Sequence, residues 1–144
     1  MNLGYFTFPI HPTEKNYYQC LMEDRQSVIL ADKLGFKEAF IGEHLTDKCE
    51  KITSCANFIS SLIFETKKIK LATGTLNLPN SHPAAIAGQV AMLDNMLKGR
   101  FIMGIGPGSL TSDMEVFDTL NKNRTEMFLE SIQHIFDIWN AEGP

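Results

Sequence analysis

The sequence contains few cysteines. There are three in 144 residues, Cys20, Cys49 and Cys55. Their number is odd, and no two of them show the C-x-x-C spacing, which argues against a disulfide framework and against a zinc site. We therefore expect a protein of a reducing compartment that holds no metal.

Clustered positive charge is also scarce. Beyond Lys67, Lys68 and Lys70 no group of basic residues stands together, and the formal net charge is -4. Because binding to nucleic acid relies on many lysines and arginines facing the phosphates, nucleic acid is not expected as a partner. The opening residues, MNLGYFTF, show no basic stretch followed by a long apolar run. We expect no membrane segment and a cytoplasmic location.

The sequence alternates between two kinds of apolar pattern. Four short runs are apolar on both faces, as buried parallel strands are, and they occupy residues 3–8, 38–44, 69–78 and 100–106. Each precedes a stretch with helical spacing, and these stretches occupy residues 17–34, 54–67, 81–99 and 124–140. This alternation predicts an α/β fold whose parallel strands are joined by right-handed crossovers.

Two ways of closing such a sheet are open. Four strands could form a small doubly wound sheet that is complete in itself. A (β/α)8 TIM barrel needs about 250 residues, so residues 1–144 would supply only its first four βα units, as a truncated barrel.

Local signals predict where the helices begin and end and what they bury. Ser54 and His82 are expected caps, Pro83 suits a first helical turn, and Gly35 and Gly99 suit helix ends. In the second helix the predicted inward side chains are Ile59, Leu62 and Ile63. In the last helix they are Phe128, Ile132, Ile135, Phe136 and Trp139.

Three glycines at alternate positions follow the fourth strand: Gly104, Gly106 and Gly108. A dinucleotide-binding loop would show G-x-G-x-x-G opening into a helix, and a P-loop would show Gly-Lys-Ser/Thr. Neither is present, because Pro107 interrupts the run and a polar loop is expected over residues 109–123. The glycines favour a strand end where a flat ligand approaches the backbone, with a simple turn as the alternative.

Polar residues gather where the second and third strands end. Glu43 and His44 follow the second strand, at the edge where such sheets place their chemistry. A histidine there suits proton transfer near neutral pH, with a hydrogen-bonded structural role as the alternative. The third strand ends in small and polar residues that suit a planar cofactor: Thr73, Gly74, Thr75 and Asn77.

The loop expected after the fourth strand carries three acidic residues: Asp113, Glu115 and Asp118. They could order a lid over a pocket, but a solvated acidic loop is the interpretation that the pattern favours.

Three segments together resemble the bacterial luciferase-like flavin monooxygenase family. They are GEH at the end of the second strand, LATGTLNLPNSHPAAIAGQVAMLDNMLKGRFIMGIGPGS, and NRTEMFLESIQHIFDIW. The resemblance covers essentially the whole chain and implies the N-terminal half, residues 1–144, of a (β/α)8 barrel. It further implies an enzyme that uses O2 and reduced FMN, supplied by a separate flavin reductase, to oxidise a small organic substrate, and a homodimer when full length.

The resemblance also implies roles for individual residues. His44 matches the histidine that acts as acid or base in aldehyde-oxidising members. Gly74 and Thr75 match a bulge under the flavin ring that often holds a non-proline cis peptide, and Gly106 lies on the same cofactor side. The flavin phosphate would bind through loops of the other half of the barrel. Pro107 and Leu45 differ from the arginine and second histidine of light-emitting members, so luminescence is not expected.

Two other functions remain open beside the monooxygenase. One is an F420-dependent hydride-transfer oxidoreductase, and the other is a non-catalytic flavin-binding protein of the same fold.

Overall fold

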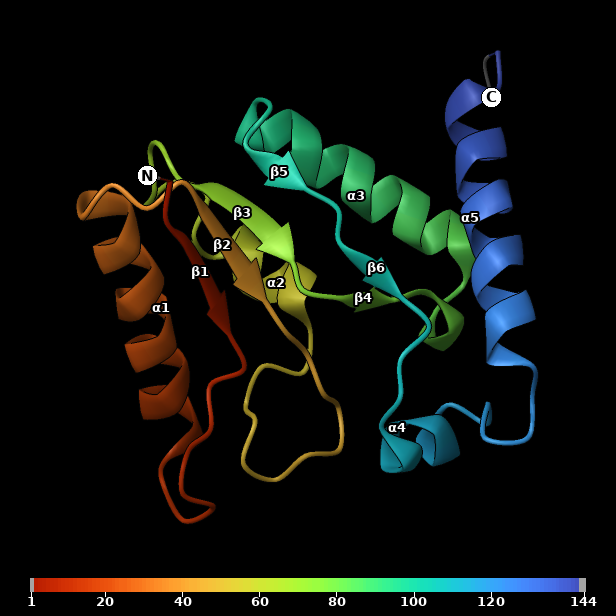
Figure 1. The fold of residues 1–144 in the computed structure, drawn as a ribbon, viewed down its shortest axis with the longest axis horizontal. Coiled ribbons are helices and arrows are strands. Elements are labelled where there is room, and N and C mark those ends of the chain that lie inside the picture. The colour runs from red at the N-terminus through yellow and green to blue at the C-terminus, as the bar shows by residue number, and fades with distance from the viewer. Residues whose placement is uncertain (1, 143–144) are drawn as a thin grey trace.

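The computed structural model describes residues 2–142 and centres on a parallel sheet. Four strands pair in the order β1-β2-β3-β5 (Figure 1): β1 Gly4–Thr7, β2 Glu38–Ile41, β3 Lys70–Thr73 and β5 Phe101–Ile102. Two further short strands, β4 Leu76–Asn77 and β6 Ile105–Gly106, pair in parallel beyond the carboxyl ends of β3 and β5. The predicted parallel strands are therefore confirmed.

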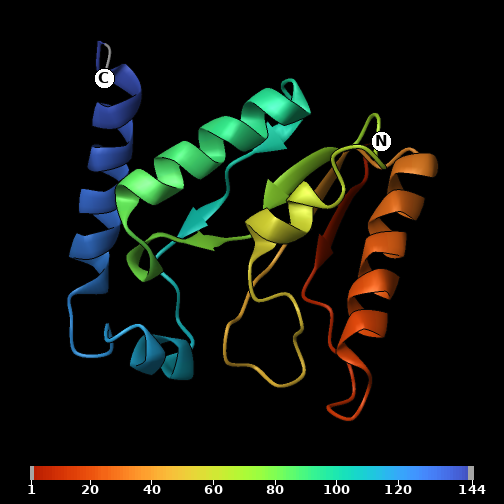
Figure 2. The same cartoon turned by 180° about the vertical axis from the view of Figure 1, so that it is seen from behind.

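In chain order the helical elements are α1 Tyr17–Lys33, α2 Cys55–Ser60, the 3-10 helix η1 Leu78–Asn80, α3 Pro83–Leu97, α4 Thr111–Val116 and α5 Arg124–Asn140. α2 and α3 cover one face of this sheet, and α5 packs against α3 (Figure 2). The core lies between the sheet and α2 and α3, where Leu71 of β3 meets fully buried Ile59, Leu62 and Leu93. The predicted inward side of the second helical stretch is therefore confirmed, and it includes Ile63.

The predicted caps and helix ends are also present. The Ser54 side chain accepts a hydrogen bond from the Asn57 amide, and His82 accepts one from the Ala84 amide. Gly35 and Gly99 follow α1 and α3 with φ of +85° and +80°. A left-handed backbone of this kind favours glycine.

Two predicted strands are shorter than expected because each is interrupted. Residues 69–78 divide into β3 and β4, and residues 100–106 divide into β5 and β6. Both pairs of strands remain parallel, but β4 and β6 leave the four-stranded sheet and pair with each other. The apolar pattern of a strand indicates that its residues are buried. It does not indicate that the strand changes its pairing partner partway along.

The helical predictions need three corrections. α2 ends at Ser60 rather than at residue 67, and residues 111–116, predicted to be loop, form α4. In α5, Ile135 is buried as predicted, but Phe136 and Trp139 are 53% and 39% exposed. The two rings contact each other edge to face, and the Trp139 indole donates to the Ala87 carbonyl at 3.1 Å.

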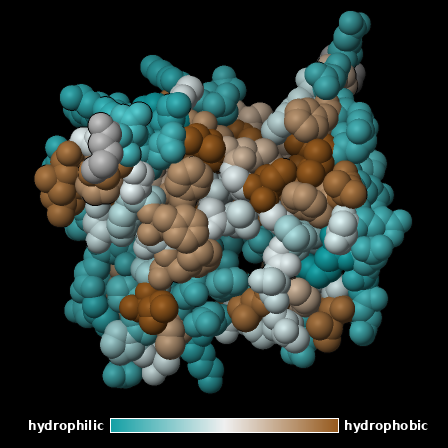
Figure 3. Space-filling view, viewed as in Figure 1, coloured by the Kyte–Doolittle hydropathy of each residue, from teal (hydrophilic) through white to brown (hydrophobic). Residues whose placement is uncertain are grey.

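The other face of the sheet is open. Figure 3 shows apolar side chains gathered on this side, over β1 and beside α5. Phe6 and Ile10 are 61% and 74% exposed there, and β1 and β5 are edge strands. An open apolar face flanked by unpaired strand edges is what a portion of a barrel presents.

One carboxylate holds the turn that leads into β3. Asp32, near the end of α1, accepts backbone hydrogen bonds from Lys67, Lys68 and Ile69 at 2.7–2.9 Å. Burial opposes ionisation, but these three donors and the Arg100 charge prevail and lower the pKa of Asp32. The carboxylate therefore stabilises the fold most when it is ionised.

We predict that Asp32→Ala lowers the free energy of unfolding by about 1–3 kcal/mol at pH 7, because three amides lose their acceptor. The folded-state pKa of Asp32 is lowered, so its contribution is present above the unfolded pKa and is lost as the pH falls through the folded one. Urea unfolding at several pH values measures this difference. Asp137→Ala, on the exposed side of α5, is the control, and equal losses in the two variants would contradict the prediction.

The open face predicts self-association of the 144-residue chain on its own, since exposed edges and apolar patches pair with other copies. Sedimentation velocity over a range of concentrations is expected to show a rising average mass. Ile10→Ser is expected to reduce this association, whereas Leu30→Ser on α1 is the matched control. A monomer at every concentration would refute the expectation.

Candidate functional site

Thr73 and Gly104 hold together the two points where strands leave the sheet. The Thr73 hydroxyl donates to the Gly104 carbonyl at 2.7 Å and accepts from the Gly104 amide at 2.9 Å. A Cβ on Gly104 would lie 2.0 Å from the Thr73 carbonyl oxygen, so only glycine allows this approach. The Gly74–Thr75 peptide bond, which follows the end of β3, is cis, as the resemblance implies.

The predicted cofactor residues lie around this bend but do not all face one cavity. Thr75 is exposed, and a Cβ on Gly106 would lie 2.7 Å from its hydroxyl oxygen, so the two residues are in close contact. Gly74 is buried, and a Cβ there would meet Phe6 and Phe40. Gly74 therefore gives space to the aromatic layer behind Thr75, while Thr75 and Gly106 line the cavity itself.

His44 pairs with an acidic residue of α4, the short helix that follows β6. Its Nδ1 lies 3.1 Å from Asp113 Oδ2, and Asp113 Oδ1 accepts from the Thr46 amide at 2.9 Å and the Thr46 hydroxyl at 2.6 Å. Asp113 is 4% exposed. The sequence favoured a solvated loop for this residue, and that interpretation is wrong: α4 turns Asp113 inward, onto the loop after β2.

The protonation of this pair follows from its contacts. Burial raises the pKa of Asp113, but the hydrogen bonds from Thr46 and His44 outweigh it, and the pKa is lowered overall. An ionised carboxylate only accepts, so Nδ1 of His44 must carry the proton. The lone pair of Nε2 is then available in the neutral imidazole, as a general base requires.

Phe8, on the loop after β1, fixes the other side of the imidazole. Its ring stacks on His44 with centroids 5.8 Å apart. A Cβ on Gly42 would lie 2.0 Å from that ring, so glycine directly after β2 makes room for it. The His11 amide donates to the Cys49 carbonyl at 2.9 Å and ties the two loops together.

The main cavity lies between these elements and has a volume of about 390 Å³. Phe8 and His44 line it from the loops after β1 and β2, and Thr75 lines it together with the loop Gly106–Ser109. This size falls in the range of ligand pockets, about 300–1,000 Å³. Its lining combines the aromatic ring of Phe8, the imidazole of His44 and the glycine-containing loop after β6.

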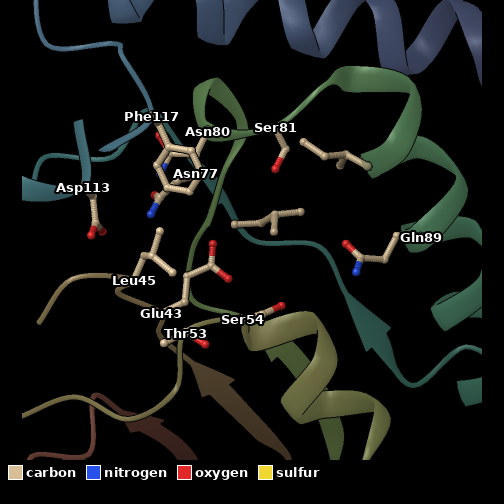
Figure 4. A pocket seen from close by; sticks show the side chains of 12 residues that line it. Glu43, Leu45, Thr53, Ser54, Asn77, Asn80, Ser81, Gln89, Asp113 and Phe117 are labelled. Atoms are coloured by element: carbon tan, nitrogen blue, oxygen red, sulfur yellow. The ribbon is translucent and has the colours of Figure 1, made fainter. Parts of the chain in front are cut away.

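A second, smaller chamber adjoins it. The chamber holds about 190 Å³ and shares two residues, Glu43 and Asn77, with the main cavity. Figure 4 shows Glu43 extending into it from the loop after β2 and Gln89 reaching in from α3. The Cys55 amide donates to Glu43 at 2.9 Å, and burial together with Glu43 raises the pKa of the Cys55 thiol, so that thiol stays protonated.

Arg124, at the start of α5, holds the loop Gly106–Ser109 in place through hydrogen bonds. Its guanidinium donates to the Pro107 carbonyl, to the Thr119 hydroxyl and to Asn80 Oδ1. Gly108 lies against it, with φ of +74° and with an added Cβ only 2.6 Å from Arg124 Nη2. Sequence reasoning missed Arg124 and favoured a solvated loop for Asp113, because each acts across a separation in the chain that no local pattern reports.

Two site expectations concern the membrane and metals. Among the described residues no helix is long and apolar enough to cross a membrane. Within residues 2–142 there is also no group of three or more His, Cys, Asp or Glu side chains that could hold a metal ion.

Comparison with known proteins identifies the class to which this fold and site belong. The sequence profile described as luciferase-like monooxygenase matches residues 1–144. The chain belongs to this luciferase-like monooxygenase family, and its architecture is that of part of a (β/α)8 barrel.

Two proteins with similar sequences are monooxygenases. The chain is 30% identical over its whole length to 4-hydroxyprotoasukamycin monooxygenase of Streptomyces nodosus subsp. asukaensis, of which it covers 39%. It is 33% identical over 81% of its length to limonene 1,2-monooxygenase of Rhodococcus erythropolis, of which it covers 30%. The chain thus spans about a third to two fifths of these relatives.

A solved structure is also similar. The oxygenating constituent of 3,6-diketocamphane monooxygenase of Pseudomonas putida, in complex with FMN, aligns with a TM-score of 0.94 and 29% identity. The alignment covers 99% of this chain and 40% of that one.

We predict that Asp113→Asn changes the tautomer of His44. The amide nitrogen of asparagine would face Nδ1 and donate to it, so the imidazole proton would move to Nε2. Long-range 1H–15N correlation spectra of the imidazole nitrogens report the tautomer directly. His134, which pairs only with Glu130 on α5, is the internal reference. A proton on Nδ1 in both proteins would show that Asp113 does not set the tautomer.

Proposed function

We propose that residues 1–144 form the first four βα units of a (β/α)8 monooxygenase that uses reduced FMN and O2 to oxidise a small organic substrate. The observation that carries the proposal is the His44–Asp113 pair, because its His44 lines the main cavity together with Thr75 and Gly106. Supply of reduced FMN by a flavin reductase and a dimeric full-length protein belong to the same proposal.

The residues present fit a flavin ring. Gly106 of β6 is buried against the exposed Thr75 side chain, and the two residues line the main cavity together. Phe8 offers an apolar surface on the opposite side. These groups could hold the ring between Thr75, Gly106 and Phe8, and reduced FMN, when bound, supplies the electrons that activate oxygen.

The protein's own residues would accept and return a proton and would keep water out of the cavity. His44 Nε2 would take a proton from the reacting substrate and return it later, while Asp113 holds Nδ1–H and stabilises the charged imidazolium. Phe8 limits rotation of the imidazole by stacking on it. Arg124 would keep the Gly106–Ser109 loop in place through the Pro107 carbonyl.

FMN binding and turnover test this proposal in the complete natural protein that contains residues 1–144. We expect His44→Ala to bind FMN as the parent does and to lose about 10²–10⁴-fold in turnover, the usual contribution of a general acid or base. Flavin fluorescence measures binding, and oxygen consumption with product formation measures turnover. His134→Ala, on the exposed side of α5, is the matched control.

The outcomes separate the three functions. Unchanged turnover in His44→Ala would remove this residue from the mechanism. Hydride transfer with F420 and none of the oxygen chemistry with FMN would favour the F420-dependent alternative. If the protein binds FMN but the bound reduced flavin is oxidised at the same rate as free flavin and no product forms, the non-catalytic flavin protein would be favoured.

A further inference from the structure

The small chamber beside the main cavity is too small to hold a whole ligand. Its volume of about 190 Å³ leaves room for about six water molecules. Ligand pockets usually have about 300 Å³ or more. Because Glu43 and Asn77 line both cavities, a ligand with its body in the main cavity can place one end in the chamber.

The uncharged polar groups of the chamber offer hydrogen-bond donors. Asn77 and Asn80 accept from Thr75 and Arg124 through Oδ1, which turns their NH2 groups to other partners. Neither NH2 group, nor that of Gln89, donates to another described residue. Ser81 and Thr53 add hydroxyls at the rim. A group that enters must therefore present an acceptor oxygen.

The charged groups of the chamber are all negative. Among its lining residues Glu43 and Asp113 are carboxylates, and none is basic. Asp113 is satisfied by His44 and Thr46, whereas Glu43 has one oxygen bonded to the Cys55 amide and the other without a partner among the described residues. An anionic group here would meet the like charges of Glu43 and Asp113, because Arg124 bonds to Asn80 but does not itself line the chamber.

The apolar part of the chamber disfavours a cation as well. Leu45, Leu76, Ile86 and Phe117 form this part of the lining. An ammonium group would give up its water against them, which costs more than desolvating a neutral hydroxyl. A hydroxyl both donates, to Glu43, and accepts, from the amide groups.

We propose that this chamber binds the hydroxyl-bearing end of a neutral organic substrate and rejects carboxylates, sulfonates and phosphates. The claim that the bound molecule is the substrate of the oxidation rests on the proposed function. The binding preference of the chamber does not depend on that function. The chamber would then act as a specificity subsite: it selects the polar end, and the main cavity receives the part to be oxidised.

Three probes of one size test the preference: benzyl alcohol, benzoate and benzylamine. In the 15N-labelled protein the side-chain NH2 signals of Asn77, Asn80 and Gln89 report entry into the chamber. Benzyl alcohol is expected to move them saturably at millimolar concentration. Benzoate and benzylamine are expected to bind at least about tenfold more weakly, a ratio that titration resolves easily.

A pair of variants localises the effect. Gln89→Leu removes a donor and is expected to weaken benzyl alcohol binding by about threefold or more. Gln133→Leu makes the same change on the exposed side of α5, where Gln133 donates to Asp137, and is expected to leave binding unchanged. The remaining amide signals of each variant show whether its fold is intact.

Benzoate binding as tightly as benzyl alcohol would overturn the proposal, and so would tighter binding of benzylamine. Equal weakening by Gln89→Leu and Gln133→Leu would also overturn it. FMN binding is measured separately in the same samples, so that loss of FMN binding with the probe preference intact would refute the proposed function alone.

Discussion

The whole site depends on the contact between Thr73 and Gly104. Two hydrogen bonds join these residues at the point where the third and fourth units leave the sheet. A side chain at position 104 would force the strands apart, because its Cβ would overlap the Thr73 carbonyl. Beyond this contact β4 and β6 pair only with each other, which separates them from β1 and β2. The space opened in this way is the main cavity.

A second constraint closes the cavity from the side of the chain that follows β6. Asp113 joins α4 to the loop after β2 through His44 and Thr46. Arg124 joins the start of α5 to the Pro107 carbonyl and to Asn80. The two residues act from opposite ends of one connecting segment, and together they hold the segment against the carboxyl ends of the strands. The geometry of the His44–Asp113 pair is therefore a result of how this segment docks.

The sequence predicted what depends on local pattern. Buried parallel strands, the caps at Ser54 and His82, and the left-handed glycines at positions 35 and 99 each follow from a few neighbouring residues. The candidate pair Glu43 and His44 was predicted because strand ends collect functional groups. These features need no knowledge of what lies across the fold.

What the sequence did not predict depends on residues that are distant in the chain. The local sequence around Asp113 predicts a solvated acid. In the structure α4 docks on Thr46, and the Asp113 carboxylate accepts from the Thr46 amide across 67 residues of chain. The exposure of Phe136 and Trp139 likewise contradicts their helical spacing, since spacing predicts an apolar face but not whether a partner covers it.

The open face and the site have a common origin. In a barrel the parallel strands present one face to the outer helices and the other to the interior, and the cavity forms where the carboxyl ends of the strands meet. Here α2 and α3 already cover the outer face, and His44, Thr75 and Gly106 already stand at the carboxyl ends. The His44–Asp113 pair and the chamber lining described here come from residues within 2–142, and among these residues no basic side chain lines either cavity apart from His44. An anionic cofactor group such as a phosphate would therefore need binding residues beyond those that line these two cavities, while the ring and the substrate end would be held by this part of the fold.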